Sequence, residues 1–151
     1  MGYTVEKKKQ KYFIGLELRT NNRECSAAMP AHKGKFFGEN TPAKIPNRIG
    51  GDILALYTDY EGDYTGDYSW VLGCEVSSLD EVPKGLIGKV IPASKYAVFS
   101  TKGAFPQGLI ATWQEIWSSN LSRSYTSDFE AYRSDFDPQM NPEVKIYIAL
   151  E

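Results

Sequence analysis

The side chain whose type and position point most directly to chemistry is the carboxylate of Glu130. It lies in the stretch Phe129–Phe136, where it alternates with apolar residues and shares a strand face with Tyr132. A glutamate on an inward-looking strand face is costly unless it has a partner. A cationic ligand held between aromatic walls would be such a partner. An edge-exposed glutamate paired with Arg133 or Lys145 is the alternative, and the residues alone leave both open.

No other group of reactive residues has the spacing of a familiar catalytic or metal site. His32 is the only histidine, and Cys25 and Cys74 do not form a C-x-x-C pair. The acidic turn between residues 59 and 67 lacks the spacing and the closing glutamate of a calcium-binding loop. The sequence contains neither G-x-G-x-x-G nor G-x-x-x-x-G-K-S/T, the two glycine-rich motifs of nucleotide-binding proteins. The sequence therefore predicts no metal site and no cofactor.

The charge of the chain is unevenly distributed around a net value of −2. Residues 1–50 carry ten Lys or Arg and four Asp or Glu, whereas acidic residues are in excess over the rest of the chain. Phosphate binding needs a basic face, so an acidic body argues against nucleic acid as a direct partner. We expect the lysine-rich start, residues 1–11, to be a solvated tail.

The length of 151 residues fits one domain over residues 1–151, with internal halves at about 11–77 and 88–151. Hydrophobic residues make up 42% of the chain, as in globular proteins. The sequence contains no run of about 18 apolar residues, which is the length needed to span a membrane. The polar start is unlike a secretion signal. Two cysteines without a disulfide pattern suggest reduced thiols, so we expect a cytoplasmic protein with no membrane partner.

Alternating and helical periodicities predict an α+β fold. We expect helices at 26–37 and 107–121, and strands at 11–19, 52–59, 69–76, 88–92, 95–102, 129–136 and 143–150. The apolar stripe of the second helix consists of Leu109, Ile110, Trp113, Ile116 and Trp117. Glu115 points away from this stripe, so we expect it to face solvent.

The order strand–helix–strand–strand occurs twice, which indicates a duplicated module. Lys11 and Lys95 are 84 residues apart, as are Met29 and Trp113 in the two helices. One such unit has too little core to stand alone, so the two should share an antiparallel sheet with the helices on one face. We expect the other face of the sheet to carry Glu75, Glu130, Tyr132 and Tyr147.

From about residue 57 onward the chain resembles the GyrI-like family, the effector-binding domain also found in AraC- and MerR-type transcription regulators. The residues that carry the resemblance are Gly73–Val76, Gly88–Lys102, Thr112–Trp117, the F-E-x-Y pattern at 129–132 and the closing strand Val144–Leu150. The chain has no room for a helix-turn-helix domain beside this module, so it resembles a stand-alone member.

The resemblance implies a ligand cleft between the two halves, lined by aromatics, with Glu130 at its base and Tyr147 on the closing strand. Glu75 and Trp113 map to positions near the cleft. The chain departs from the family pattern after Trp117, where Ser118–Asn120 replaces a Trp-Leu-Pro run, so the loop that caps the cleft should differ. The expected ligand-binding residues are Glu130, Tyr147, Glu75, Trp113, Tyr132, Trp117 and Phe36.

Three functions fit these observations. The first is a module that senses or sequesters amphipathic, cationic, drug-like molecules. The second is a hydrolase of strained cyclopropane-type natural products, with Glu130 as general base beside Tyr147. The third is an interaction protein that binds gyrase or a transcription regulator through its acidic body. Twenty aromatic residues and the glutamate among them favour the first function.

Overall fold

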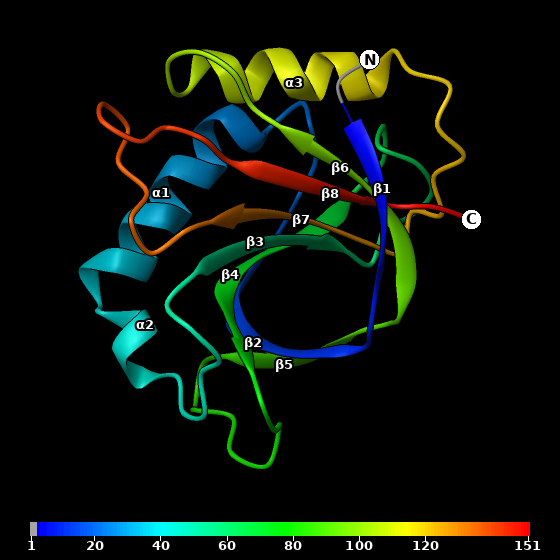
Figure 1. Ribbon diagram of the computed structural model, residues 1–151. Helices are drawn as coiled ribbons and strands as arrows, with labels where there is room; N and C mark the ends of the chain where they lie inside the picture. The colour runs from blue at the N-terminus through cyan, green and yellow to red at the C-terminus, as the bar shows by residue number, and fades with distance from the viewer. Residues whose placement is uncertain (1–2) are drawn as a thin grey trace.

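The computed structural model describes residues 3–151 and has an α+β fold built on one eight-stranded antiparallel sheet (Figure 1). The strands are β1 (Tyr3–Lys8), β2 (Lys11–Thr20), β3 (Ile53–Thr58), β4 (Tyr68–Val76), β5 (Ile87–Ile91), β6 (Ser94–Ser100), β7 (Ser127–Tyr132) and β8 (Lys145–Ala149). The helices are α1 (Cys25–Gly38), α2 (Thr41–Lys44) and α3 (Gln107–Trp117). The order of the strands across the sheet is β1-β6-β8-β7-β3-β4-β2-β5.

The two predicted halves meet at the centre of the sheet, where β7 pairs with β3. The strand that precedes β2, β1, pairs with β6 of the second half, and β5 at the start of the second half pairs with β2 of the first. Each half is thus completed by a strand from the other end of the repeat. The lysine-rich start is thus largely the edge strand β1, and our expectation of a solvated tail was wrong. Its backbone finds partners along β6, and the Tyr3 ring lies 5.0 Å from the Phe99 ring.

The sheet is strongly curved, and a pair of glycines permits close approach of β2 and β4. Gly15 and Gly73 lie opposite each other in the register of these strands. A Cβ atom on Gly73 would collide with the carbonyl oxygen of Ile14, and one on Gly15 with that of Leu72. Glycine is the residue that tolerates such contact between neighbouring backbones.

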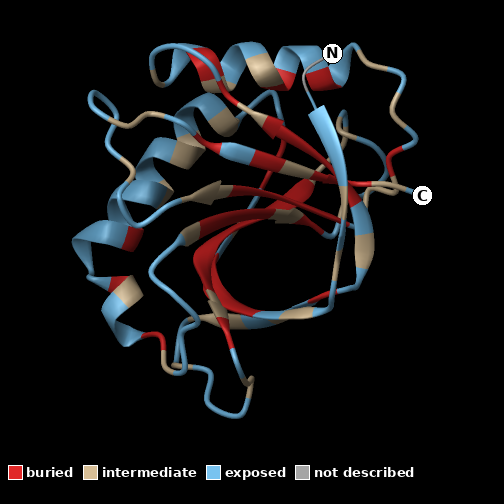
Figure 2. Cartoon of the chain, viewed as in Figure 1, coloured by how far each residue is buried: buried red, intermediate tan, exposed pale blue. Residues whose placement is uncertain are grey.

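Helices α1 and α3 cover the same face of the sheet. The register aligns Leu16, Leu72, Ala55, Glu130, Ile146 and Phe99 across this face. Helix α1 buries Phe36 against one end of the row, and α3 buries Trp113 and Ile116 against the other. Exposed residues remain on the outer sides of both helices (Figure 2). The expectation of helices on one face is therefore confirmed.

The opposite face curls around a second apolar core that includes Phe13, Leu56, Val98 and Phe129. Glu75 and Tyr147 lie on this face, as expected, because they pair with Phe13 and Phe129 in the register. Placing Glu130 and Tyr132 there was wrong, since Glu130 pairs with Ala55 and Ile146 on the helical face. Alternation predicts which residues of one strand share a face. Only the register between strands, together with the packing of the helices, shows which face the helices cover.

The remaining differences concern the ends of two elements and one short helix that was not expected. Helix α3 ends at Trp117 and β7 at Tyr132, about four residues before the expected ends, and α2 lies in a stretch expected to be a loop. The other expected elements begin and end within two residues of the observed ones. Glu115 is exposed, as its helical phase predicted.

Candidate functional site

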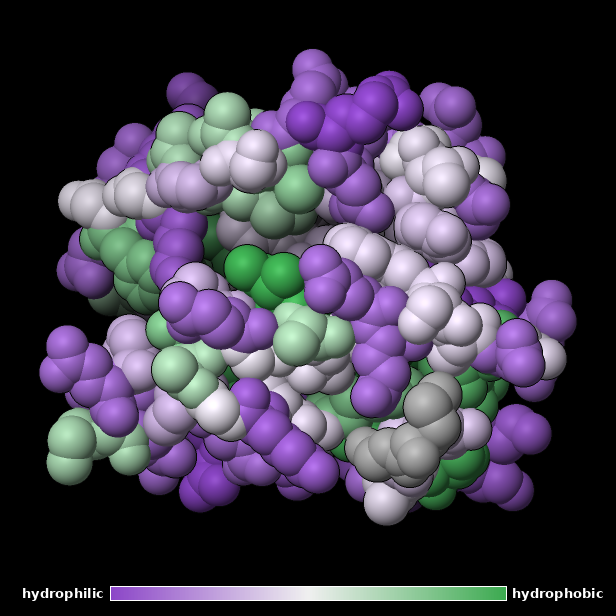
Figure 3. All heavy atoms as spheres, turned by 90° about the horizontal axis from the view of Figure 1, so that it is seen from above, coloured by the Kyte–Doolittle hydropathy of each residue, from purple (hydrophilic) through white to green (hydrophobic). Residues whose placement is uncertain are grey.

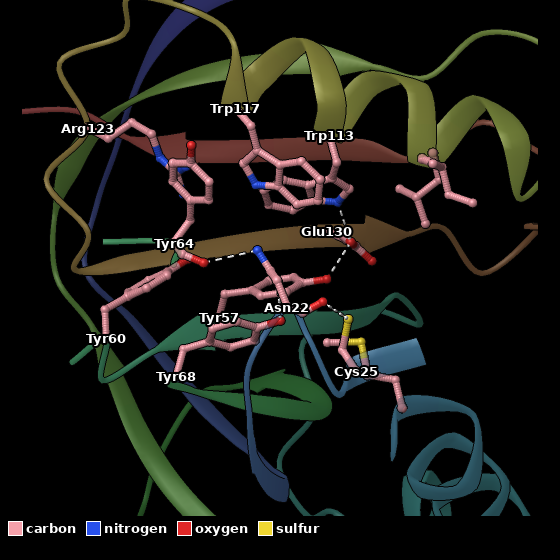
Figure 4. Close-up of a pocket in the computed structure, with 13 residues that line it drawn as sticks. Asn22, Cys25, Tyr57, Tyr60, Tyr64, Tyr68, Trp113, Trp117, Arg123 and Glu130 are labelled. Carbon is pink, nitrogen blue, oxygen red and sulfur yellow. Dashed lines mark hydrogen bonds between the residues drawn. The ribbon is translucent and has the colours of Figure 1, made fainter. Parts of the chain in front are cut away.

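A cavity of about 190 Å³ lies between α3 and the first turns of α1, over the centre of the sheet. Its walls contain Asn22, Cys25, Met29, Tyr57, Tyr60, Tyr64, Tyr68, Leu109, Ile110, Trp113, Trp117, Arg123 and Glu130 (Figure 4). Seen from the side of α3, hydrophobic residues reach the surface in the middle of the face, among hydrophilic ones (Figure 3). The cavity contains side chains from both halves of the chain.

The carboxylate of Glu130 accepts three hydrogen bonds and is only 2% exposed. Its Oε2 atom accepts from the Tyr57 hydroxyl at 2.8 Å and from Trp113 Nε1 at 2.7 Å. Its Oε1 atom accepts from the Tyr132 hydroxyl at 2.6 Å. These donors come from β3, α3 and β7, so the carboxylate is held where the two halves meet.

The electrostatic situation of Glu130 is that of a buried acid without an adjacent cation. None of the ion pairs within 4.0 Å over residues 3–151 includes it. Burial raises the pKa of Glu130, while the bonds from Tyr132, Tyr57 and Trp113, and the more distant charge of Lys33, act in the opposite direction. The hydrogen bonds thus only partly offset the loss of hydration.

Aromatic rings form the walls on either side of this carboxylate. The Tyr57 ring lies 5.1 Å from Trp113 and 5.5 Å from Tyr68, and Trp113 lies 6.0 Å from Trp117. Trp117 is 36% exposed, and its ring stacks on Tyr64 at 6.0 Å with 14° between the ring planes. The faces of such rings attract cations, and they also bury apolar ligand surface.

A buried ion pair lies elsewhere along the same cavity. Asp128 accepts from Arg123 Nη2 at 2.8 Å and from the Tyr60 hydroxyl at 2.6 Å, and its second oxygen accepts from the backbone N–H of Ala149 at 2.8 Å. The guanidinium of Arg123 also lies over the Tyr125 ring, 4.3 Å from its centre. Asp128 therefore balances the charge of Arg123, whereas no described residue balances Glu130 in this way.

Of the residues expected at the ligand site, four gather at the cavity. Glu130, Trp113 and Trp117 line it, and Tyr132 donates to Glu130. Trp113 is only 8% exposed, as its place in the apolar stripe of α3 indicated.

The other three expected residues lie elsewhere. Phe36 is fully buried in the core beneath α1. Glu75 binds Lys11 at 3.2 Å, and Tyr147 stacks on Phe129 at 4.5 Å, both on the opposite face of the sheet. Tyr147 lines a different and more polar cavity, of about 510 Å³, with Asp52, Arg133 and other polar residues. Adjacent strand positions point to opposite faces, so the pairing of Tyr147 with Phe129 removes it from Glu130.

This arrangement corrects the catalytic pair of the hydrolase hypothesis. Glu130 and Tyr147 lie on opposite faces of the sheet and do not act on one substrate together. The hydroxyls that reach Glu130 belong instead to Tyr57 and Tyr132, and burial raises the pKa of each well above 10, with the charge of Glu130 adding to the shift.

Sequence reasoning missed most of the first half's contribution to the cavity. Tyr57, Tyr60, Tyr64 and Tyr68 all line it, and Arg123 closes one side. The only signal in the sequence was the large number of tyrosines, ten in all, without an indication of which ones converge. Arg123 lies in the irregular segment between α3 and β7, where periodicity says nothing about direction.

No group of three or more His, Cys, Asp or Glu side chains within residues 3–151 is placed to hold a metal ion. Among the helices of this part of the chain, none combines the length and apolar character needed to cross a membrane.

Comparison with known sequences gives a match over almost the whole chain. A family model described as that of an integron-associated effector binding protein matches residues 4–150. YobU from Bacillus subtilis (strain 168), a protein named as a candidate transcriptional regulator, is 30% identical over 148 residues, which is 93% of this chain and 92% of the relative. The transcriptional regulator BrlR of Pseudomonas aeruginosa is 35% identical over 92 residues, or 56% of this chain and 34% of BrlR.

Solved structures share the fold. An integron cassette protein from the mobile metagenome of Vibrio cholerae superimposes with a TM-score of 0.77 at 27% identity, over 99% of this chain and 96% of the other. SAV2435, whose structure contains bound tetraphenylphosphonium, superimposes with a TM-score of 0.82 at 20% identity, over 100% of this chain and 94% of the other.

Proposed function

The chain belongs to the family of integron-associated effector binding proteins with the GyrI-like fold, and from this we propose that its ligands are amphipathic organic cations bound beside Glu130. The family name describes effector binding in general. The chemical class of the ligand, and the residues that select it, are our proposal from the cavity itself.

The observation that carries the proposal is the state of Glu130. The carboxylate is buried and oriented by three donors, yet none of residues 3–151 supplies a counter-charge within ion-pair distance. A buried charge without a partner is unfavourable, so a cation that enters the cavity gains an attraction that water would weaken. The ring faces of Trp113 and Tyr57 suit the same cation.

The relatives support this choice of ligand class. SAV2435 has been seen with tetraphenylphosphonium, a cation surrounded by aromatic rings, and it shares the fold of this chain. At 20% identity the likeness concerns the fold alone, so the ligand enters here only as a proposal for this chain. YobU and BrlR are named as regulators, which fits a sensor or sequestering module more closely than an enzyme.

The cavity has to open for such a ligand to enter. Pockets for drug-sized molecules generally measure about 300–1,000 Å³, whereas this one measures about 190 Å³. We propose that the stacked rings of Tyr64 and Trp117 separate on binding. Tyr64 lies in the turn between β3 and β4. This turn has open space around it, because a Cβ atom added at Gly62 would have nothing within 4 Å.

We also propose that the protein works in the cytoplasm, in keeping with its two free cysteines.

The test is the substitution Glu130→Gln, which keeps the shape of the side chain and removes its charge. We expect this variant to bind butyltriphenylphosphonium more weakly by about 1.5–3 kcal/mol, the range for hydrogen bonds to charged groups. Neutral triphenylphosphine oxide should lose much less affinity. Isothermal titration calorimetry of both compounds measures the difference.

The matched control is Glu115→Gln on the exposed side of α3, which should leave both affinities unchanged. If the two compounds weaken equally in Glu130→Gln, then Glu130 only shapes the cavity. If neither weakens, cations bind elsewhere and the proposal fails.

A further inference from the structure

The cavity has a second polar side, formed by Arg123. This residue is 8% exposed and lines the same cavity as Glu130. In Figure 4 the two side chains stand at opposite sides of the group of rings that includes Tyr57 and Trp117. A ligand that touches Glu130 and extends along these rings approaches Arg123.

Arg123 has hydrogen-bond donors that no described residue uses. A guanidinium carries five N–H groups, and Nη2 donates to Asp128. The Nε and Nη1 atoms are both buried, and within residues 3–151 neither has a hydrogen-bond partner. A buried donor without a partner destabilises a protein, so a ligand acceptor placed there would gain the bonds that the protein leaves unmade.

The charge balance around Arg123 indicates which acceptor fits. Asp128 already neutralises the guanidinium, and its side chain is fully buried at 2.8 Å from Nη2. A second carboxylate beside this pair would be repelled by Asp128 while losing its own hydration. A neutral carbonyl or ester oxygen accepts the same hydrogen bonds without either cost.

We propose that the preferred ligands carry, besides the cationic centre at Glu130, a neutral carbonyl-type oxygen that accepts hydrogen bonds from Arg123. This inference rests on the proposed function and narrows it to cations with an acceptor at the far end of the molecule. Because the two nitrogens are covered in the closed cavity, the ligand reaches them when Tyr64, which lies on the side of Arg123 in Figure 4, moves aside.

Three triphenylphosphonium compounds with chains of equal length test the inference on the unaltered protein. One chain is heptyl, one ends in a methyl ester, and one ends in a carboxylate. We expect the ester to bind about tenfold more tightly than the heptyl compound, which corresponds to one typical hydrogen bond, and also more tightly than the carboxylate. Equal affinity of the ester and heptyl compounds would overturn the inference. A carboxylate that binds more tightly than the ester would overturn the choice of a neutral acceptor.

The variant Arg123→Lys ties the preference to this residue. Lysine keeps a positive charge for Asp128 but lacks the spare donors of the guanidinium fork. The preference for the ester over the heptyl compound should fall about tenfold in this variant, while thermal unfolding confirms that it folds. Arg133→Lys, at an exposed arginine, is the control and should keep the preference.

The same measurements separate the two proposals. If the heptyl compound does not bind, the proposed function itself fails. If it binds through Glu130 but the ester gains nothing, only the role of Arg123 fails.

Discussion

At the scale of single residues, the behaviour of the site follows from the balance between burial and hydrogen bonding at Glu130. Three donors favour the ionised carboxylate, and burial disfavours it more strongly, so its pKa is raised above the ordinary value of 4.5. A cation in the cavity shifts this balance toward ionisation. Ligand binding and loss of a proton from Glu130 are therefore linked.

This linkage predicts a pH dependence for a ligand whose own charge never changes. As the pH falls through the raised pKa of Glu130, the carboxyl takes up a proton and loses its attraction for the cation. We expect the affinity for butyltriphenylphosphonium to fall by up to about tenfold per pH unit below that pKa, which is the limit for one proton. Titrations from about pH 4.5 to pH 8 on the protein and on Glu130→Gln measure it. A slope that persists in the variant would assign the effect to another group.

The stability of the ligand-free protein should show the opposite trend. Between pH 4.5 and the raised pKa, the folded protein holds a proton on Glu130 that the unfolded chain has released. The contribution of Glu130 to the free energy of unfolding therefore decreases as the pH rises through this window and levels off above it. Its ionised form thus costs stability in the ligand-free protein, and a cation bound beside it would recover that cost.

Which single residues could be predicted from the sequence depended on the kind of signal each gives. Glu130 was identifiable because a carboxylate interrupts an apolar strand within an F-E-x-Y pattern. Tyr147 was misplaced because its partner in the sheet, Phe129, is known only from the register of β7 and β8. Arg123 gave no signal, since its role depends on the position of Asp128 five residues later and on a loop of irregular direction.

At the scale of elements, the internal repeat extends further than periodicity alone revealed. The offset of 84 residues also relates Tyr3 at the start of β1 to Ile87 at the start of β5. The lysines of β1 concealed this strand, because edge strands tolerate charge and show little apolar alternation. After the first helix the offset is lost, and α2 is an element of the first half alone.

The turn that carries Tyr64 and the end of α3 that carries Trp117 form the side of the cavity that we propose to open. If their stacked rings must separate before a ligand enters, opening limits the rate of association. We expect Tyr64→Ala to raise the association rate of butyltriphenylphosphonium several-fold and to weaken equilibrium binding by about 0.5–1 kcal/mol through loss of one ring face. Stopped-flow tryptophan fluorescence measures the association and dissociation rates, and their ratio gives the equilibrium affinity.

The control for this variant is Tyr12→Ala, which removes a tyrosine that is 37% exposed and does not line the cavity. Its rates should equal those of the unaltered protein. An unchanged association rate in Tyr64→Ala would mean that the ligand enters by another route.

At the scale of the whole molecule, the site exists only where the two halves meet. Glu130 lies on β7, which pairs with β3 of the first half, and one of its three donors, Tyr57, comes from β3 itself. The tyrosines of the wall belong to the first half, and Trp113, Trp117 and Arg123 belong to the second. A duplicated module thus forms one asymmetric cavity, with the acid supplied by the second half only.

The exchange of β1 and β5 between the halves leads to a prediction about folding. A cut before Gly85, which lies exposed in the connection between β4 and β5 with φ +88°, yields fragments 1–84 and 85–151. Each fragment alone leaves a central strand, β3 or β7, with only one of its two neighbouring strands and exposes the apolar face beside it. We expect neither fragment to show cooperative thermal unfolding, and an equimolar mixture to recover the circular dichroism spectrum and the phosphonium binding of the intact protein. The uncut chain, which should unfold in a single transition, is the reference. A fragment that unfolds cooperatively by itself would show that a half is an independent domain and that only the cavity, and not the fold, requires both.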